Sequence, residues 1–138
     1  MKIENKLFNL YNEYIKTYSQ FEPEIYNDTP QELSKFPTII FVENNNKDSN
    51  INKTTNKIEY SNDLQYKIEI YSKNKTINNK LYARKTITDE LKYLTFEFLS
   101  KCNISRTDCR KGEYLDLSVD RTIILGECNI NSWNGKIR

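Results

Sequence analysis

The stretch Leu64–Leu99, LQYKIEIYSKNKTINNKLYARKTITDELKYLTFEFL, predicts a strand followed by a long helix, and the rest of the fold is built around these two elements. Its first residues alternate between apolar and polar, so Tyr66, Ile68 and Ile70 share one face of a predicted strand. Lys67 and its polar neighbours lie on the other face. This alternation is typical of a half-buried strand, so the apolar face must be covered by another element.

The second part of the same stretch predicts a long helix over about 79–101. Its apolar residues recur in steps of four, three and four, which places them on one stripe: Ile87, Leu91, Leu94 and Phe98. A stripe of this kind has to be buried. The apolar face of the preceding strand is the natural surface for it, so the helix is expected to pack on the sheet.

The elements before this stretch follow from similar patterns. Residues 3–18 predict an amphipathic helix, and Thr29 followed by Pro30 predicts the start of a second, short helix. The next strand is predicted by a run of β-branched and aromatic residues: Thr38, Ile39, Ile40, Phe41 and Val42. A nearly continuous apolar run indicates a strand covered on both faces, or covered on one face by another subunit. Ile39–Val42 are therefore candidate interface residues.

The elements after the long helix are all extended. Residues 103–109 predict a short strand, 115–119 a half-buried extended segment, and 121–125 the last strand. The chain is thus expected to adopt an α+β fold. Its sheet is mostly antiparallel, with about four to five strands, and the N-terminal helix and the long helix pack on one face.

The length of 138 residues fits a single domain, 1–138. The polar stretch 44–56 is expected to be a flexible loop between two strands, and 129–138 a C-terminal tail. No apolar run approaches the roughly 20 residues that a membrane helix needs, and no signal peptide is recognisable at the N-terminus. We expect a soluble protein, made in the cytoplasm, with no membrane partner.

Charge is distributed unevenly along the chain. Residues 1–43 hold four Lys and seven acidic residues, a net charge of −3, whereas 73–111 hold ten Lys or Arg and four acidic residues, a net charge of +6. One interpretation is a solvated helix face. The other is a protein with an acidic side and a basic side, which can associate head-to-tail with its own copies or turn the basic side toward nucleic acid.

The composition argues against most enzyme classes. The chain has no His, which removes His-dependent nucleophiles, imidazole bases and most catalytic zinc sites. Three Cys cannot fill a four-ligand zinc site, and three scattered Gly do not form a phosphate-binding loop. We expect no catalytic residues, no metal and no cofactor, and hence a protein that is not an enzyme.

One basic cluster stands outside the helices: Arg106, Arg110, Lys111 and Arg121. If the late strands are neighbours, these side chains can share a sheet edge and contact phosphates or another subunit. The alternative is that they are solvent-exposed or paired with neighbouring aspartates. They are the candidate residues for a DNA-facing surface or a subunit interface.

As a whole the chain resembles the tail-terminator, or tail-completion, proteins of long-tailed bacteriophages and of related phage-tail-like particles. The resemblance rests on the order and spacing of five pieces: FPTIIF (Phe36–Phe41), YKIEIY (Tyr66–Tyr71), the helix Leu81–Lys101, ISR (Ile104–Arg106) and DRTII (Asp120–Ile124). Together they span about residues 36 to 128. Cys102-Asn103 occupies the turn where many relatives have a Gly, and Asn can adopt the left-handed conformation there.

The resemblance implies a structural protein of the virion tail or neck. Such a protein forms a homo-oligomeric ring, usually hexameric, that caps the tail tube of a contractile or other long tail and joins it to the neck. Its expected partners are further copies of itself, tube and sheath proteins, neck or connector proteins, and the genomic DNA that passes through the lumen. The alternatives are a head-tail connector of the same particle and a small non-enzymatic nucleic-acid-binding protein.

Overall fold

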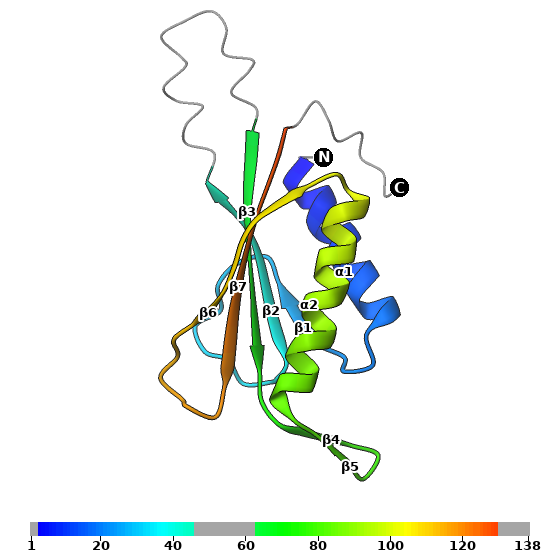
Figure 1. Ribbon diagram of the computed structural model, residues 1–138, viewed down its shortest axis with the longest axis vertical. Helices are drawn as coiled ribbons and strands as arrows, with labels where there is room; N and C mark the ends of the chain where they lie inside the picture. Colours follow the sequence, from blue (N-terminus) through cyan, green and yellow to red (C-terminus); the bar gives the residue numbers. More distant parts are fainter. Residues whose placement is uncertain (1–2, 46–62, 130–138) are drawn as a thin grey trace, which may run out of the picture.

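The computed structural model describes residues 3–45 and 63–129 (Figure 1). The helices are α1 (Ile3–Tyr18) and α2 (Arg84–Lys101), and the strands are β1 (Glu24–Tyr26), β2 (Thr38–Asn45), β3 (Asp63–Ser72), β4 (Lys75–Ile77), β5 (Lys80–Tyr82), β6 (Ser105–Gly112) and β7 (Asp120–Asn129). Of the predicted loop and tail, 46–56 and 130–138 lie outside the described residues. Neither of the described helices is long and apolar enough to cross a membrane.

Five strands form one sheet in the order β1-β2-β3-β7-β6. The neighbours pair antiparallel except for β1 and β2, which are parallel. The strands β4 and β5 form a separate hairpin between β3 and α2. Both helices lie on one side of the sheet (Figure 1). The predicted α+β fold, with a mostly antiparallel sheet and an N-terminal and a long helix on one face, is confirmed.

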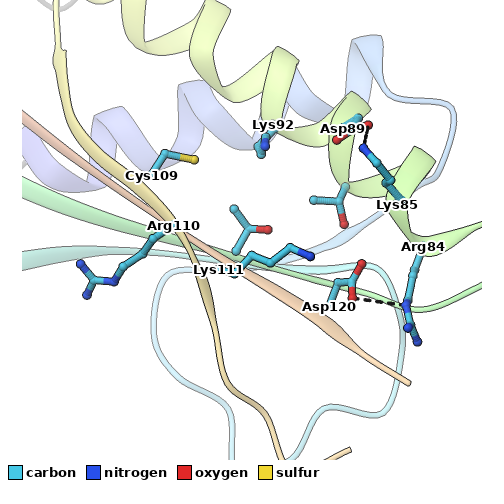
Figure 2. A pocket seen from close by; sticks show the side chains of 10 residues that line it. Arg84, Lys85, Asp89, Lys92, Cys109, Arg110, Lys111 and Asp120 are labelled. Atoms are coloured by element: carbon cyan, nitrogen blue, oxygen red, sulfur yellow. Dashed lines mark hydrogen bonds and ion pairs between the residues drawn. The ribbon is translucent and has the colours of Figure 1, made fainter. Parts of the chain in front are cut away.

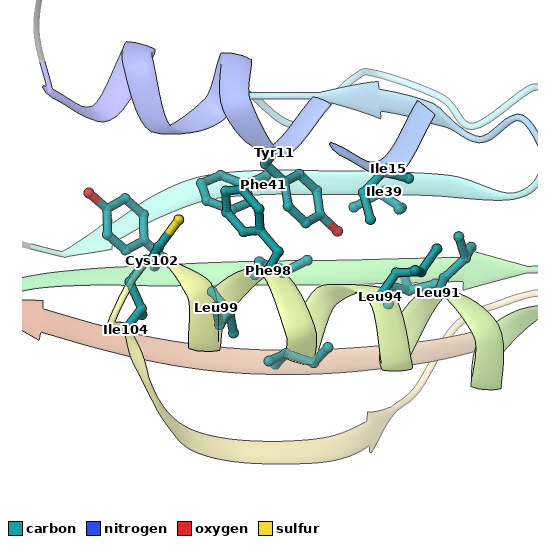
Figure 3. Close-up of a cluster of buried hydrophobic side chains, with 14 of the residues drawn as sticks. Tyr11, Ile15, Ile39, Phe41, Leu91, Leu94, Phe98, Leu99, Cys102 and Ile104 are labelled. Carbon is teal, nitrogen blue, oxygen red and sulfur yellow. The ribbon is translucent and has the colours of Figure 1, made fainter. Parts of the chain in front are cut away.

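The main core lies between this face and the two helices (Figure 3). The predicted helical stripe of α2 is buried against apolar strand residues and against α1, in a cluster that includes Tyr11, Ile15, Ile39, Phe41, Ile68, Ile70, Leu91, Phe98 and Ile124. The Tyr11 and Thr95 hydroxyls are 2.8 Å apart and join α1 to α2 inside this core. Burial of each such side chain contributes about 1.5–3 kcal/mol, so this core holds the helices on the sheet.

The other face of the sheet has a smaller core of Ile40, Tyr71 and Val119. The chain itself covers it, because Leu33 and Phe36 from the segment after β1, and Tyr114 from the β6–β7 connection, pack on it. The strand β2 is therefore covered on both faces by residues of the same chain, which is the first of the two predicted arrangements.

Two predicted segments differ from the structure. No helix forms from Thr29, where the backbone makes only bends; so short a helix gains few hydrogen bonds for its nucleation cost, and Leu33 and Phe36 contact the sheet instead. The segment 115–119 is not half-buried along its length. Leu115 and Leu117 are 100% and 88% exposed, and only Val119 packs inward.

The ends of the long helix show what the sequence predicted well and what it did not. Between β3 and the helix, the chain forms the β4–β5 hairpin, whose turn residues Asn78 and Asn79 both have positive φ. The helix therefore begins five residues later than predicted, at Arg84. After the helix, Asn103 has a φ of 62°, which confirms the left-handed turn predicted at this position.

Candidate functional site

A groove of about 470 Å³ lies between the first half of α2 and the strands β6 and β7 (Figure 2). Helix α2 packs mainly on β3 and β7, so the space between α2 and the edge strand β6 is only partly filled. The groove is lined by Arg84, Lys85, Thr88, Asp89, Lys92, Cys109, Arg110, Lys111, Asp120 and Thr122. It lies on the helix-covered side of the sheet, at the β6 edge.

Helical and strand periodicity place the lining residues. Arg84, Thr88 and Lys92 are four residues apart, so they form a stripe on α2 beside the buried apolar stripe. On β6, Lys111 is opposite Thr122 of β7 in the register, and it extends along the groove in Figure 2. Arg110, its neighbour on the strand, points away from the groove (Figure 2).

The groove is strongly basic. The cations directed to this side of the sheet are Arg84, Lys85, Lys92 and Lys111, and with the carboxylates Asp89 and Asp120 they give a net charge of +2. Both carboxylates are already paired: Arg84 Nε lies 3.2 Å from Asp120, and Lys85 Nζ lies 3.0 Å from Asp89. Lys92 and Lys111 make no ion pair with any residue that the structure describes. Their charges remain available to an anion.

A buried hydroxyl lies at the same site. Thr88 is only 7% exposed, and its Oγ1 finds no hydrogen-bond partner within the described part of the chain. A buried polar group without a partner costs about 1–3 kcal/mol, so such groups are rare unless a ligand or water satisfies them. Thr122, 4% exposed, also lines the groove. The Thr88 oxygen is itself buried, so the groups that an anion in the groove can reach are the ammonium groups of Lys92 and Lys111.

The lining does not form a metal site. Across residues 3–45 and 63–129, no three His, Cys, Asp or Glu side chains gather closely enough to hold a metal ion. The groove contains one thiol, that of the half-buried Cys109. Its main chemical feature is the positive charge of its lysine and arginine side chains.

The structure separates the four basic residues predicted as one cluster. Lys111 lines the groove. Arg106 lies on the same side of the sheet, where its guanidinium stacks over the Phe96 ring of α2 at 3.9 Å. Arg110 points to the opposite side, where its Nη1 donates to Asp108 at 2.6 Å. The cluster is thus divided between two faces because neighbouring strand residues point in opposite directions.

Arg121 is engaged by groups of the same chain, and 27% of its side chain is exposed. Its Nε donates to Glu69 at 2.9 Å, Nη2 pairs with the same carboxylate, and Nη1 donates to the Glu113 carbonyl at 3.1 Å. Glu69 is 4% exposed. Burial, followed by the charge of Glu69, raises the pKa of the adjacent Tyr71. This ion pair ties β3 to β7 on the face that the helices do not cover.

The sequence reasoning missed Arg84, Thr88 and Lys92. Their four-residue spacing was a usable signal, because it places two cations and a hydroxyl on one helical stripe. The apolar stripe beside it was the stronger pattern, so the helix was interpreted only as an element that packs on the sheet. The groove also depends on which side of β6 faces α2, and the pairing of β6 with β7 decides that.

The opposite edge of the sheet carries the opposite charge. Residues 22–32 hold four acidic residues and no Lys or Arg, and they include β1, the other edge strand. A second hollow, of about 280 Å³, lies beside this edge, with Asp28 and Glu43 in its lining together with the candidate interface residues Phe41 and Val42. Ile39 and Ile40 are fully enclosed. The two edges of the sheet are therefore electrostatically complementary.

The lower end of the molecule in Figure 1 holds the β4–β5 hairpin and the β6–β7 connection. Leu81 on the hairpin is 66% exposed, and Leu115 and Leu117 on the connection are more exposed still. Arg84 Nη1 donates to the Leu117 carbonyl at 3.3 Å, and Lys73 pairs with Asp116 at 3.4 Å, so the connection is tied to residues flanking the hairpin. Hydrogen bonds from Ser118, and then Lys73, lower the pKa of Asp116.

Comparison with known protein families finds none that matches this chain. Comparison with curated proteins finds no relative either.

Proposed function

We propose that this chain is a non-enzymatic structural protein of a phage tail or phage-tail-like particle, and that it acts as a tail terminator. In this role its copies form a ring that caps the tail tube and joins it to the neck. The proposal starts from the resemblance in the order of elements. The arrangement of an N-terminal helix, a strand pair, a long helix and two late strands, packed as one sheet with both helices on one face, is compatible with it.

One observation carries the ring. The sheet has two edges of opposite charge: β1 and its flanking acidic residues at one end of the strand order, and β6 with the basic groove at the other. A surface on one side that complements a surface on the other makes a head-to-tail contact, and such contacts close into rings when the rotation allows. A face that complements itself would instead favour a two-fold dimer.

The exposed leucines of the β4–β5 hairpin and the β6–β7 connection suit the axial contact. In a ring closed through the two sheet edges, the end of the molecule that holds both loops is not used for the lateral contact. Leu81, Leu115 and Leu117 expose apolar area on these two loops, and a partner that covers both loops would bury it. We assign this end to the tail tube or to the neck.

The test is co-sedimentation with tail tubes assembled from the tube protein of the same genome, followed by electron microscopy. A terminator binds at the tube end and stops further growth of the tube. Protein that binds neither tubes nor isolated necks would contradict the proposal. Protein that binds the neck alone would favour a head-tail connector, because the two roles share this outline.

A small nucleic-acid-binding protein is the second candidate, and the unpaired Lys92 and Lys111 favour it. Phosphate contacts of this kind are independent of base sequence and weaken steeply with salt. A gel shift of duplex DNA by a monomer, lost between about 50 and 200 mM salt, would support this function over the structural one.

A further inference from the structure

We propose that the groove between α2 and β6 receives the acidic segment Glu22–Glu32 of a second copy of this chain. Carboxylates of that segment bind the ammonium groups of Lys92 and Lys111. This inference rests on the proposed ring and names the contact that closes it. It does not follow from charge counts along the sequence, because those do not separate paired from unpaired cations.

The groove suits side-chain carboxylates. It is a recess of about 470 Å³, and both Lys92 and Lys111 line it. A carboxylate accepts hydrogen bonds from ammonium groups, and such charge-assisted bonds are stronger than those between neutral groups. Arg110 points away from the groove in Figure 2, and its guanidinium is engaged by Asp108. Lys92 and Lys111 are therefore the cations that the groove offers to a neighbouring copy.

The segment Glu22–Glu32 has the properties that the groove requires. It contains Glu22, Glu24, Asp28 and Glu32. Glu24 accepts a hydrogen bond from the Tyr26 hydroxyl, and Asp28 accepts one from the Thr29 amide, so these two carboxylates are partly used within the chain. Glu22 and Glu32 are exposed and make no ion pair among residues 3–45 and 63–129. They are the two that reach a neighbour most readily.

The strand order makes this contact intermolecular. The acidic segment flanks β1 and the groove flanks β6, and three strands separate these two edges. One molecule therefore cannot fill its own groove with its own segment. Each copy can use its segment on one side and its groove on the other, which is the head-to-tail arrangement of a closed ring.

The experiment uses two charge-reversed variants of the full chain. The groove variant carries Lys92→Glu and Lys111→Glu, and the segment variant carries Glu22→Lys and Glu32→Lys. Each variant alone places like charges on both sides of the contact, whereas a one-to-one mixture restores opposite charges at every contact. Solution mass is measured by light scattering for the wild type, each variant and the mixture, alone and on tail tubes.

We expect the wild type to assemble and each variant alone to remain monomeric, with self-association weakened by about 100-fold, because opposed like charges disfavour association strongly. The mixture is expected to recover assembly, with the two variants alternating. Recovery also shows that both variants are folded. Circular dichroism of each variant provides a second check on folding.

The matched control reverses Lys6 and Lys16, two exposed lysines of α1, and changes the net charge as much as the groove variant does. It should assemble like the wild type. If the groove variant assembles normally, or if the mixture of folded variants fails to assemble, the inference is overturned while a ring and the proposed function remain.

Two further outcomes separate the inference from the proposed function. A wild type that is monomeric both alone and on tail tubes overturns the inference, yet binding of that monomer to tube ends leaves the proposed function standing. A wild-type monomer that shifts duplex DNA, with the shift lost in the groove variant, overturns the inference and assigns the groove to phosphates.

Discussion

Lys111 and Arg121 are near neighbours in the sheet, and the fold uses them in opposite ways. Gly112 is opposite Arg121 in the register of β6 and β7, and Lys111 is opposite Thr122, so the two cations are one step apart. Arg121 lies on the face without helices, where it is held by Glu69 and by the Glu113 carbonyl. Lys111 lies on the face beneath α2, where its ammonium group has no ion-pair partner in the described chain.

The position of a cation along a strand therefore says little about whether its charge is available to a ligand. Arg121 satisfies a buried carboxylate, and removing it would leave that carboxylate charged and unpaired. Removing Lys111 would leave nothing unpaired. Arg121 therefore stabilises the sheet, whereas the charge of Lys111 is available to a ligand. Substitutions at Arg121, at Thr88 and at Lys92 together with Lys111 test this contrast through their effects on stability.

Arg121→Met should have the largest effect. It removes the partner of Glu69, which is 4% exposed, and we expect the free energy of unfolding to fall by about 3 kcal/mol. Urea unfolding at neutral pH measures this loss. The double variant Glu69→Leu with Arg121→Met removes both charges and should recover most of the stability, because no unpaired charge remains. A double variant as unstable as the single one would contradict the role assigned to the pair.

Thr88→Val should act in the other direction. The hydroxyl of Thr88 is buried without a partner, so replacing it with a methyl group of similar shape should raise the free energy of unfolding by about 1 kcal/mol. Thermal unfolding of the isolated protein measures this. Thr95→Val is the matched control on the same helix, since the Thr95 hydroxyl lies 2.8 Å from that of Tyr11 and also bonds the Leu91 carbonyl. Thr95→Val should lower the free energy of unfolding, because it removes these hydrogen bonds. If Thr88→Val lowers it as well, the Thr88 hydroxyl is not an unsatisfied buried group.

Much of the fold was predictable because periodicity survives folding. The alternation around Ile68 and the helical stripe around Phe98 correctly identified the elements and the faces that meet. The parts that were missed are those set by tertiary contacts. The segment after Thr29 has local helix signals, but Leu33 and Phe36 gain more by packing on the sheet than a single helical turn would.

The candidate site was less predictable than the fold. Lys111 was identified as a candidate, but Arg84, Thr88 and Lys92 reach the same groove only because β6 pairs with β7 on the side that places Lys111 beneath α2. The partners of Arg121 could not be predicted either, because they also depend on how the strands pair. Glu69 is 52 residues away in the chain, and the β3–β7 register alone brings the two together.

Glu97 offers a smaller, pH-dependent test on another side of α2. Hydrogen bonds from Tyr14 and then Tyr93 lower the pKa of Glu97 from its usual value of 4.5. A lowered pKa in the folded state stabilises the protein above the usual value, and this stabilisation is lost as the pH falls through the lowered one. Burial, and then the Glu97 bond, raise the pKa of Tyr14 to about 12, so its hydroxyl stays protonated and keeps donating.

The variant Glu97→Gln should therefore be slightly less stable than the wild type near pH 7, and the difference should shrink as the pH falls toward 3. Urea unfolding at both pH values measures the difference. The wild type, but not the variant, carries the pH dependence that this carboxylate contributes. An equal loss at both pH values would indicate that packing, rather than the charge of Glu97, holds α1 to α2 here.

Lys92→Met with Lys111→Met should have the smallest effect on stability, within about 0.5 kcal/mol of the wild type, because neither ammonium group pairs with another described residue. Thermal unfolding measures this at low protein concentration, where the chain is a monomer. The same variant should lose the ability to assemble, because the groove then lacks the cations that bind the neighbour's carboxylates. A destabilisation as large as that of Arg121→Met would show that Lys92 and Lys111 stabilise the folded chain itself. If the variant keeps its stability but no longer assembles, then Lys92 and Lys111, unlike Arg121, are residues that bind another molecule.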